Sequence, residues 1–543
     1  MRGADLIVQY LREAGVRFVF GVPGTTNMDL IDGMYGSRDI RYISARHEQV
    51  AASMADACGR LIGNPGVVIT HAGSGAANVA LGIAIAHRDG TPLVLFTGNY
   101  EGRALPKEPW QSLNQLGLYK AIVKWSAQPK SAGDLPRVIQ KALKVTMAGR
   151  PGPVHVDLPL DVSRGEVALP ARRRRFKLEI PHTQAPEEVV VRAAELLAAA
   201  ERPIILAGWG AVRSGAAPEV DQLSRLLSVP VVSSNSGRGI VPEDHPHCAG
   251  VSGRLGDAAA SAAMKESDAV LALGVGLSDL TTGDWTLIQP GAKLIHVNAE
   301  PAELRKYYTP EVGVAADAKT FLVQLLEALE RRGPARGANG DRVAKAHEAF
   351  MGERRGFLDV PLSGSPVQHR QIPAAAARVL DRDAITTVGA GTHSRYASRV
   401  FCYQPGANLK AVGLGSMCFA FPAAMGAKLT RPQNQVVCFV GDGDFGMVLQ
   451  DLETAVRERI GVVCVIFNDF SFASQKAIQR NRFQGRYLGT DFTNPDFARL
   501  AELFGARGQR VERAEQLQPA LEEALRDGRP AVIDVILNRE VLE

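Results

Sequence analysis

The sequence predicts an α/β protein with three domains, each built on a doubly wound parallel sheet. At 543 residues the chain exceeds what one hydrophobic core supports, so its length favours about three domains of ordinary size. Short β-branched runs alternate with helical patterns along the chain, which is typical of parallel α/β sheets. The apolar content of 46% and charged content of 22% are those of an ordinary globular protein.

The first predicted domain covers residues 1–165. An amphipathic helical pattern opens it, and the runs GVVITHA (66–72) and PLVLFTG (92–98) are predicted strands with a helix between them. The run GPVHVDLPLDV (152–162) closes the domain. A basic, proline-bearing connector (166–186) leads to the next domain.

The second predicted domain covers residues 187–330. Its predicted strands are PIILAGWG (203–210), VPVVSSN (229–235), AVLALGVG (269–276) and KLIHVNAEP (293–301). A glycine-rich, charged hinge follows, and the third predicted domain covers residues 355–543.

Charge and cysteine usage limit the compartment and the partners. The net charge of +5 is spread out, and the densest basic run (172–175) reads as a solvated connector, so we expect no nucleic-acid partner. The six cysteines show no C-x-x-C spacing, which favours a reducing compartment. Because no signal-peptide pattern and no apolar run of about 18 residues occurs, we expect a cytoplasmic protein with no membrane partner.

Two aspartates in the third domain each follow an apolar run. Asp442 comes after QVVCFV (435–440), and Asp469 comes after GVVCVIFN (461–468). In a right-handed βαβ unit both lie at the carboxyl ends of parallel strands, where open sheets bind ligands. Two carboxylates there suit a divalent cation that carries a diphosphate. A crossover helix is expected between the strands, and its apolar face contains Phe445, Val448, Leu449, Leu452, Ala455, Val456 and Ile460.

The pattern G-D-G, 24 residues (444–467) and then Asn-Asp resembles the signature of thiamine-diphosphate-dependent enzymes. The resemblance implies that Asp442 and Asp469 hold Mg²⁺ with their side chains and that Ser471 adds its backbone carbonyl. At the positions of Asn468 and Asp469 the family usually has Asn-Asn. Asp469 keeps an oxygen ligand at the second of these positions and adds a negative charge.

The resemblance extends to the other cofactor contacts. Glu48, in ARHEQVAASMADACGR (45–60), matches the glutamate that hydrogen-bonds the pyrimidine N1′ and promotes loss of the thiazolium C2 proton. Gly415 matches the residue whose carbonyl meets N4′, and Met417 the residue wedged beneath the two rings. Thr392 and His393 match the diphosphate contacts. The implied cofactor site comprises Glu48, Thr392, His393, Gly415, Met417, Gly441, Asp442, Gly443, Asp444 and Asn468.

The resemblance covers nearly the whole chain in the order pyrimidine-binding, central Rossmann-like and diphosphate-binding domain, which acetolactate synthases, pyruvate oxidases and benzoylformate decarboxylases share. In this family Glu48 and Asp442 meet across a subunit interface, which implies a homodimer or homotetramer. Some relatives hold FAD or ADP in the central domain. The loose G-x-G of 208–215 is a weak dinucleotide signal, and Leu280 replaces the arginine of flavin-binding synthases after Asp279, so FAD stays open and is not favoured.

Two comparisons bear on the reaction. The segment after Asp469 aligns with that of acetolactate synthases, but Ser474, Gln475 and Ile478 replace the apolar residues that shape their acceptor pocket. Gln111, in the pair Trp110-Gln111, resembles that family's Phe-Gln pair, so it is expected to face the cofactor.

Toward benzoylformate decarboxylase, His71 matches a proton-shuttling histidine, and Thr25 occupies the place of a substrate-contacting serine. A histidine has the pKa range for proton transfer near neutrality, although a lone histidine at a strand end also serves structural roles. That enzyme's second histidine has no counterpart between His247 and His296, which weighs against simple decarboxylation.

We therefore expect an enzyme that uses thiamine diphosphate and Mg²⁺ to decarboxylate a 2-oxo acid, with ligation to an aldehyde or ketone acceptor left open. The alternatives are a 2-hydroxyacyl-thioester lyase or oxalyl-thioester decarboxylase and, from another class, a non-catalytic cofactor-binding regulator. The joint presence of Glu48, Asp442 and Asn468-Asp469 weighs against the regulator.

Overall fold

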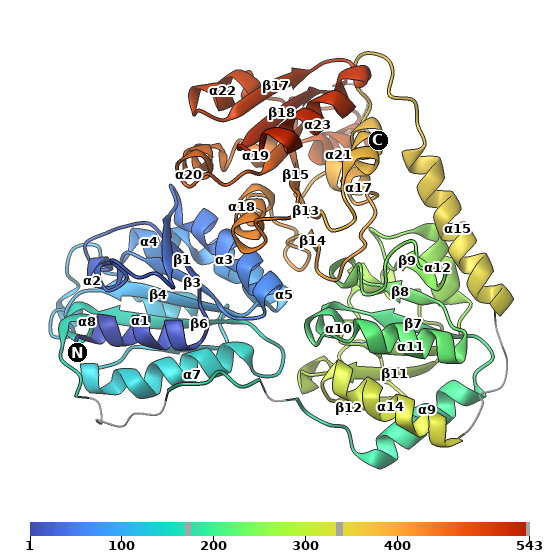
Figure 1. Ribbon diagram of the computed structural model, residues 1–543, viewed down its shortest axis with the longest axis horizontal. Helices are drawn as coiled ribbons and strands as arrows, with labels where there is room; N and C mark the ends of the chain where they lie inside the picture. The colour runs from blue at the N-terminus through green and yellow to red at the C-terminus, as the bar shows by residue number, and fades with distance from the viewer. Residues whose placement is uncertain (169–174, 181, 333–339, 539–543) are drawn as a thin grey trace.

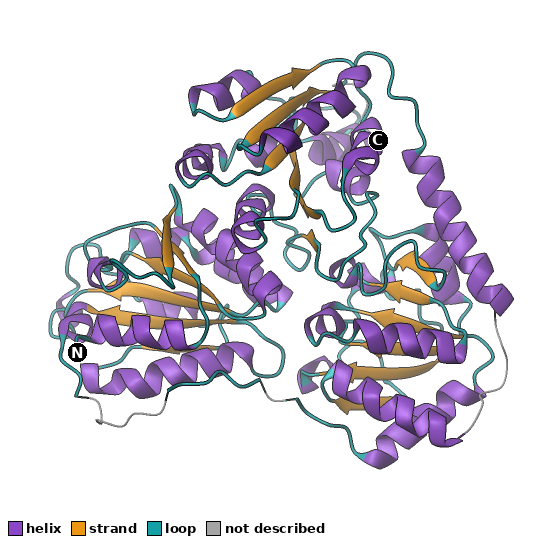
Figure 2. Ribbon diagram, viewed as in Figure 1, coloured by secondary structure: helices purple, strands orange, loops and turns teal. Residues whose placement is uncertain are grey.

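The computed structural model describes residues 1–168, 175–180, 182–332 and 340–538. It contains three six-stranded sheets, one after another along the chain (Figures 1 and 2). The strands pair in parallel within each sheet, and helices cover the sheets. The predicted α/β fold with three parallel-sheet domains is confirmed. Residues 172–174 of the basic run and 333–339 of the hinge lie outside the described residues.

The first sheet has the strand order β2-β1-β3-β4-β6-β5. Its strands are β1 (Phe18–Gly21), β2 (Arg41–Ser44), β3 (Gly66–Thr70), β4 (Leu93–Asn99), β5 (Trp125–Ala127) and β6 (Pro153–Pro159). The helices of this part are α1 (Gly3–Glu13), α2 (Met28–Asp32), α3 (Glu48–Ile62), α4 (Ser74–Asn78), α5 (Ala80–Asp89), α6 (Gln115–Tyr119), α7 (Leu135–Met147) and α8 (Leu160–Arg164). The central strands β3, β4 and β6 are buried along their whole length, as continuous apolar runs in parallel sheets require.

The second sheet has the order β12-β11-β10-β7-β8-β9. Its strands are β7 (Pro203–Ala207), β8 (Val231–Ser233), β9 (Cys248–Val251), β10 (Ala269–Leu273), β11 (Lys293–Asn298) and β12 (Val312–Ala315). Its helices are α9 (Glu187–Ala199), α10 (Trp209–Arg213), α11 (Ala217–Leu227), α12 (Ala258–Lys265), α13 (Asp279–Thr282) and α14 (Ala318–Arg332). The long helix α15 (Gly340–Leu358) then runs from this domain towards the third sheet (Figure 1).

The third sheet has the order β14-β13-β15-β16-β18-β17. Its strands are β13 (Ile385–Val388), β14 (Asn408–Leu409), β15 (Val436–Gly441), β16 (Val463–Asn468), β17 (Arg507–Val511) and β18 (Ala531–Ile536). Its helices are α16 (Gln371–Val379), α17 (His393–Ala397), α18 (Ala420–Thr430), α19 (Asp442–Phe445), α20 (Leu452–Arg457), α21 (Ala473–Arg482), α22 (Phe497–Leu503) and α23 (Leu517–Asp527).

The crossover between β15 and β16 differs from the single helix that the periodicity predicts. It consists of α19, a 3₁₀ turn (Leu449–Asp451) and α20. Gly443 and Gly446 weaken the helix at its start, because glycine is a poor helix former. The predicted apolar face is nevertheless buried or packed against the core, so the periodicity identified the buried side chains but not the breaks.

The first and third domains pack through helices α3 and α18, which lie side by side (Figure 1). Gly426 of α18 comes so close to α3 that a Cβ atom there would lie 2.3 Å from the carbonyl oxygen of Met54. One hydrophobic core continues through both helices. Predicted site residues lie at or near the start of both helices, since Glu48 opens α3 and Met417 lies three residues before α18.

Two further observations concern the whole described chain. None of its helices is long and apolar enough to cross a membrane. All six cysteines are free thiols.

Candidate functional site

A cavity of about 620 Å³ lies at the carboxyl edge of the third sheet. Its walls are the loops that follow β13, β14, β15 and β16, together with Asn235, Leu255 and Leu280 of the central domain. This is the edge at which open parallel sheets bind ligands. Most of the predicted cofactor residues line it, namely Thr392, His393, Gly415, Met417, Gly441, Asp442, Gly443 and Asp444, with Asp469 and Ser471 beside them.

The two predicted metal-binding carboxylates lie together in this cavity. Strands β15 and β16 are neighbours with Gly441 opposite Phe467, so Asp442 and Asp469 follow adjacent strand ends. Both are buried. Burial and, second, the negative charge of Asp469 raise the pKa of Asp442 to about 7.

These carboxylates form a donor set for a hard divalent cation. Asp469 accepts hydrogen bonds from the backbone N–H and the hydroxyl of Ser471, at 3.1 and 3.0 Å, which fixes the loop that carries the predicted Ser471 carbonyl. Among the described residues no group of three or more His, Cys, Asp or Glu side chains is arranged to hold a metal. A cation here would therefore rely on two carboxylates, a main-chain carbonyl and oxygens from outside the chain, which suits Mg²⁺ bound to a phosphate group.

Asn468 has a different position from that of its neighbours. Its side chain is fully buried and donates to Asp534 at 2.8 Å, so it supports the loop from behind and does not line the cavity. Asn494, which the sequence did not single out, donates to Asp442 at 2.7 Å and to the Asn468 side-chain oxygen at 2.8 Å. The only sequence signal at Asn494 is an Asn-Pro turn, which carries no chemistry.

His393 is the second feature of the cavity that fits a phosphate group. Its Nε2 atom is buried and has no hydrogen-bond partner. Burial and, second, the positive charge of Lys410 lower the pKa of His393 to about 3, while a backbone hydrogen bond with Gly389 opposes them, so its imidazole is neutral. Thr392 shares a hydrogen bond with Ser474 at 2.8 Å, which orients its hydroxyl towards α21.

Asp444 ties two cavity loops together. It accepts hydrogen bonds from the backbone N–H groups of Cys418, at 2.6 Å, and Ala390, at 3.3 Å. Burial raises the pKa of Asp444 to about 7. A Cβ atom on Gly389 would lie 2.2 Å from Asp444, so glycine is required there. Gly415 has φ +62°, a conformation that glycine adopts without strain, and Met417 lines the cavity beside it.

Glu48 lies outside this cavity. No described residue of the range 1–165 lines it. Glu48 is buried at the start of α3 and accepts one hydrogen bond, at 3.0 Å, from the side chain of Asn78. A Cβ atom on Gly75 would approach the other carboxylate oxygen of Glu48 to 3.1 Å, so the small residue leaves that side of the carboxylate free.

His71 and Gln111, predicted from resemblances to two different enzymes, lie next to each other. The His71 Nδ1 atom lies 2.8 Å from the hydroxyl of Thr26 and accepts the Thr26 backbone N–H at 3.3 Å. Since Nδ1 is an acceptor, Nε2 carries the proton and donates it to the side-chain oxygen of Gln111 at 3.0 Å. Tyr100 donates to the same oxygen at 3.2 Å. Thr25 is exposed, and Thr26 is the threonine that contacts His71.

A second cavity, of about 460 Å³, lies between the first and central domains. The loose G-x-G segment borders this cavity through Trp209 and Gly210. Arg213 also lines it, and the Nε atom of Arg213 is buried without a hydrogen-bond partner. Asp279, which matches a family position, pairs with Arg254 at 3.1 Å. Leu280 borders both cavities.

Comparison with known proteins places this geometry in a family. Three models of thiamine pyrophosphate enzymes match the chain, namely the N-terminal TPP binding domain (residues 1–118), the central domain (190–325) and the C-terminal TPP binding domain (389–535). The chain is 33% identical to the probable acetolactate synthase large subunit of Methanocaldococcus jannaschii, over 99% of this chain and 92% of that protein.

It is 31% identical to the acetolactate synthase isozyme 3 large subunit of Escherichia coli, over 99% of this chain and 95% of that protein. It is also 32% identical to the acetolactate synthase large subunit of Mycobacterium tuberculosis, over 99% of this chain and 88% of that protein. The chain therefore belongs to the thiamine pyrophosphate enzymes and is of the acetolactate synthase type.

Proposed function

We propose that this protein uses thiamine diphosphate and Mg²⁺ to remove carbon dioxide from a 2-oxo acid and to join the remaining carbon unit to an aldehyde or ketone. The observation that carries the proposal is the pair Asp442 and Asp469, buried and facing one cavity at adjacent strand ends. The joint presence of this pair with Glu48 weighs against a non-catalytic cofactor-binding regulator, which would have no need for a group that transfers protons.

The chain's own residues have separable roles in this chemistry. Asp442, Asp469 and the carbonyl of Ser471 would hold Mg²⁺, while His393 and Thr392 would donate to the diphosphate. When bound, thiamine diphosphate supplies a nucleophilic carbon that adds to the 2-oxo group and accepts the electron pair that decarboxylation releases.

Glu48 would keep a proton at the pyrimidine N1′ position, and the Nε2 proton of His71, oriented by Gln111, would serve proton transfer to or from the product.

The second carbonyl substrate is the open part of the reaction. Similarity to acetolactate synthases supports carboligation. Ser474 and Gln475 line the cavity, whereas Ile478 does not and is exposed. A hydroxyl and an amide on this wall make it more polar than an apolar acceptor pocket, which favours an acceptor with a polar group next to its carbonyl.

We further propose that a second copy of the chain completes each site. Glu48 does not reach the cavity of its own chain. Apolar side chains of the segment around Gln111 are exposed, namely Trp110, with 81% of its surface, Leu113, Leu116 and Leu118. Exposed apolar patches of this kind mark interfaces. A homodimer is the smallest assembly that brings Glu48 of one copy to the cavity of another, and a homotetramer would contain two such pairs.

The central-domain cavity does not alter this proposal. The buried Nε atom of Arg213 suits an anionic ligand, and an adenine nucleotide such as ADP or FAD is the class that relatives place there. Leu280, which borders this cavity, replaces the arginine of flavin-binding synthases, so FAD is not favoured.

The proposal is tested by release of carbon dioxide from 2-oxo acids. We expect release to require both added thiamine diphosphate and Mg²⁺ and to stop on chelation. Asp442→Asn should weaken Mg²⁺-dependent cofactor retention in calorimetry, whereas the matched variant Asp381→Asn, an exposed aspartate of the same domain, should not. Release that continues at full rate in chelator would contradict the metal-dependent mechanism.

A further inference from the structure

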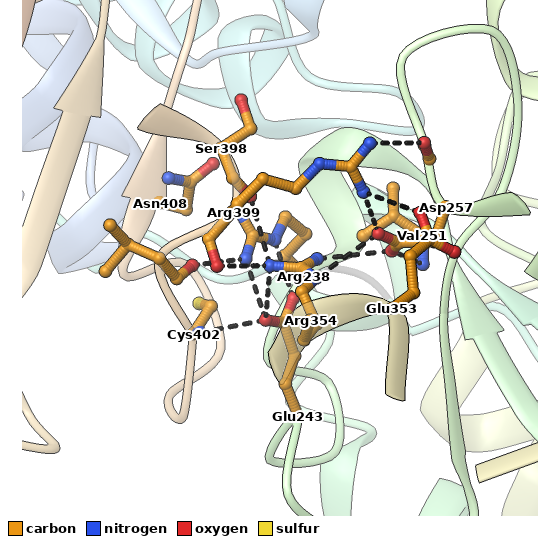
Figure 3. A network of polar contacts seen from close by, with 12 residues as sticks. Arg238, Glu243, Val251, Asp257, Glu353, Arg354, Ser398, Arg399, Cys402 and Asn408 are labelled. Atoms are coloured by element: carbon orange, nitrogen blue, oxygen red, sulfur yellow. Dashed lines mark hydrogen bonds and ion pairs between the residues drawn. The ribbon is translucent and has the colours of Figure 1, made fainter. Parts of the chain in front are cut away.

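Buried charged side chains join the central domain to the third sheet (Figure 3). Arg238 binds both carboxylate oxygens of Glu243 at 2.7 Å. Arg354 binds both oxygens of Asp257 at 3.2 Å, and Arg399 also pairs with Asp257. The last carboxylate of the cluster, Glu353, pairs with Arg399 at 3.2 Å. Each carboxylate of this cluster is therefore already bound by an arginine.

Lys410 belongs to the same cluster but has no such partner. It follows the edge strand β14 and lines the cavity of the third sheet. Its ammonium group donates to the hydroxyl of Ser398, which is neutral. Among the ion pairs of the described residues, none involves Lys410. Four cations (Arg238, Arg354, Arg399 and Lys410) therefore face three carboxylates (Glu243, Asp257 and Glu353).

We propose that Lys410 is the counter-ion of the cofactor's diphosphate. The inference rests on the proposed function, because it requires that thiamine diphosphate occupies this cavity. It adds a cationic contact to the hydrogen-bond donors, Thr392 and His393, that the sequence had implied. A lysine binds phosphate as a point charge, so it needs proximity rather than a fixed hydrogen-bond geometry.

The position of Lys410 favours the diphosphate over the carboxylate of a 2-oxo acid. Lys410 and His393 both line the cavity, and the charge of Lys410 is the second cause of the lowered pKa of His393. His393 is neutral there, and its Nε2 atom is buried without a hydrogen-bond partner. An ammonium group that lines a cavity without a carboxylate partner makes an anion site, and the two charges of Mg²⁺ would be used by Asp442 and Asp469.

The energetics of the ligand-free cavity agree with this role. Burial is the main cause that lowers the pKa of Lys410, to about 7, and the charges of Arg238, Arg354 and Arg399 lower it further, whereas Glu243 opposes them. A cation in this setting is unfavourable until an anion joins it. Lys410 therefore costs stability in the free protein and contributes affinity when the diphosphate is bound.

The test measures binding to the purified full-length protein by calorimetry in excess Mg²⁺. Two probes are titrated, thiamine diphosphate and inorganic diphosphate, which lacks the rings. The variants are Lys410→Met, which removes the charge, and Lys410→Arg, which keeps it. The matched control is Lys428→Met, because Lys428 is a partly buried lysine of the same domain whose partner is the backbone carbonyl of Asn434, at 2.8 Å, and which does not line the cavity.

We expect Lys410→Met to weaken binding of both probes by the same factor, about 10- to 100-fold, the usual size of a hydrogen bond to a charged group. Lys410→Arg and Lys428→Met should bind within about threefold of the unaltered protein. The melting temperature of the cofactor-free Lys410→Met protein should equal or exceed that of the unaltered protein. If Lys410→Met does not fold, Lys410→Gln, whose amide can still bond to Ser398, replaces it.

Two results would overturn the inference, and a third would refute the proposed function on which it rests. Unchanged affinity of Lys410→Met for both probes would show that Lys410 does not bind the diphosphate. A higher KM of that variant for the 2-oxo acid would then assign Lys410 to the substrate. If Lys410→Met bound thiamine diphosphate more weakly but inorganic diphosphate unchanged, Lys410 would act on the cofactor's rings and not on its diphosphate. Failure of the unaltered protein to bind thiamine diphosphate would instead refute the proposed function itself.

Discussion

The substitution Glu48→Gln should abolish proton exchange at the pyrimidine ring while leaving the fold of the first domain unchanged. The Glu48 carboxylate accepts one hydrogen bond, from Asn78 at 3.0 Å, and a glutamine oxygen can accept the same bond. The substitution keeps the shape of the side chain, so we expect the fold and the binding of thiamine diphosphate to persist. An amide cannot exchange a proton with the pyrimidine ring, so catalysis should fall by about 100- to 10,000-fold, or about 2.7 to 5.4 kcal/mol of barrier.

The assay follows exchange of the cofactor's C2 proton for deuterium by NMR, alongside turnover of a 2-oxo acid. Exchange and turnover should fall together, while calorimetry reports unchanged cofactor affinity. Glu453→Gln is the matched control, since Glu453 forms a surface ion pair with Arg457 at 2.9 Å. Exchange and turnover at the rates of the unaltered protein would refute the role of Glu48.

Three further predictions address separate features. His71→Ala removes the proton donated to Gln111, so turnover should fall while cofactor affinity stays the same, and unchanged kinetics would assign His71 a structural role. Mixing the inactive variants Glu48→Gln and Asp442→Asn should restore about a quarter of full activity, because half of the dimers are mixed and each has one intact site; no recovery would place both residues in one chain's site. Arg354→Met leaves Asp257 short of a buried partner and should lower the free energy of unfolding by about 3 to 5 kcal/mol, and a loss under about 1 kcal/mol in chemical denaturation would contradict the importance of this ion pair.

The three-sheet fold could be predicted because parallel strands, buried on both faces, leave continuous apolar runs in the sequence. The same rule placed Asp442 and Asp469 at one edge, since a βαβ unit fixes the direction of both strands. The crossover helix was less predictable. Its apolar period survives where the helix is interrupted, because burial constrains the side chains more strongly than the backbone.

Other details depend on loops and on contacts distant in sequence. Thr25 and Thr26 are adjacent, and only the path of the loop after β1 decides which one contacts His71. Asn494 reaches Asp442 from 52 residues away. Lys410 follows a two-residue edge strand, and its missing counter-ion becomes visible only when the partners of its neighbouring arginines are known. The domain bounds and the role of each site residue remain predictions.

Product analysis tests the proposed reaction most directly. The protein is incubated with thiamine diphosphate, Mg²⁺ and a panel of 2-oxo acids, with and without added aldehydes and ketones, and the products are identified by mass spectrometry. We expect carbon dioxide and an acyloin whose formation depends on the cofactor and is lost in Glu48→Gln. Aldehyde as the only product would show that the protein decarboxylates the 2-oxo acid without carboligation. No product from any 2-oxo acid would contradict the proposed function and point to thioester substrates.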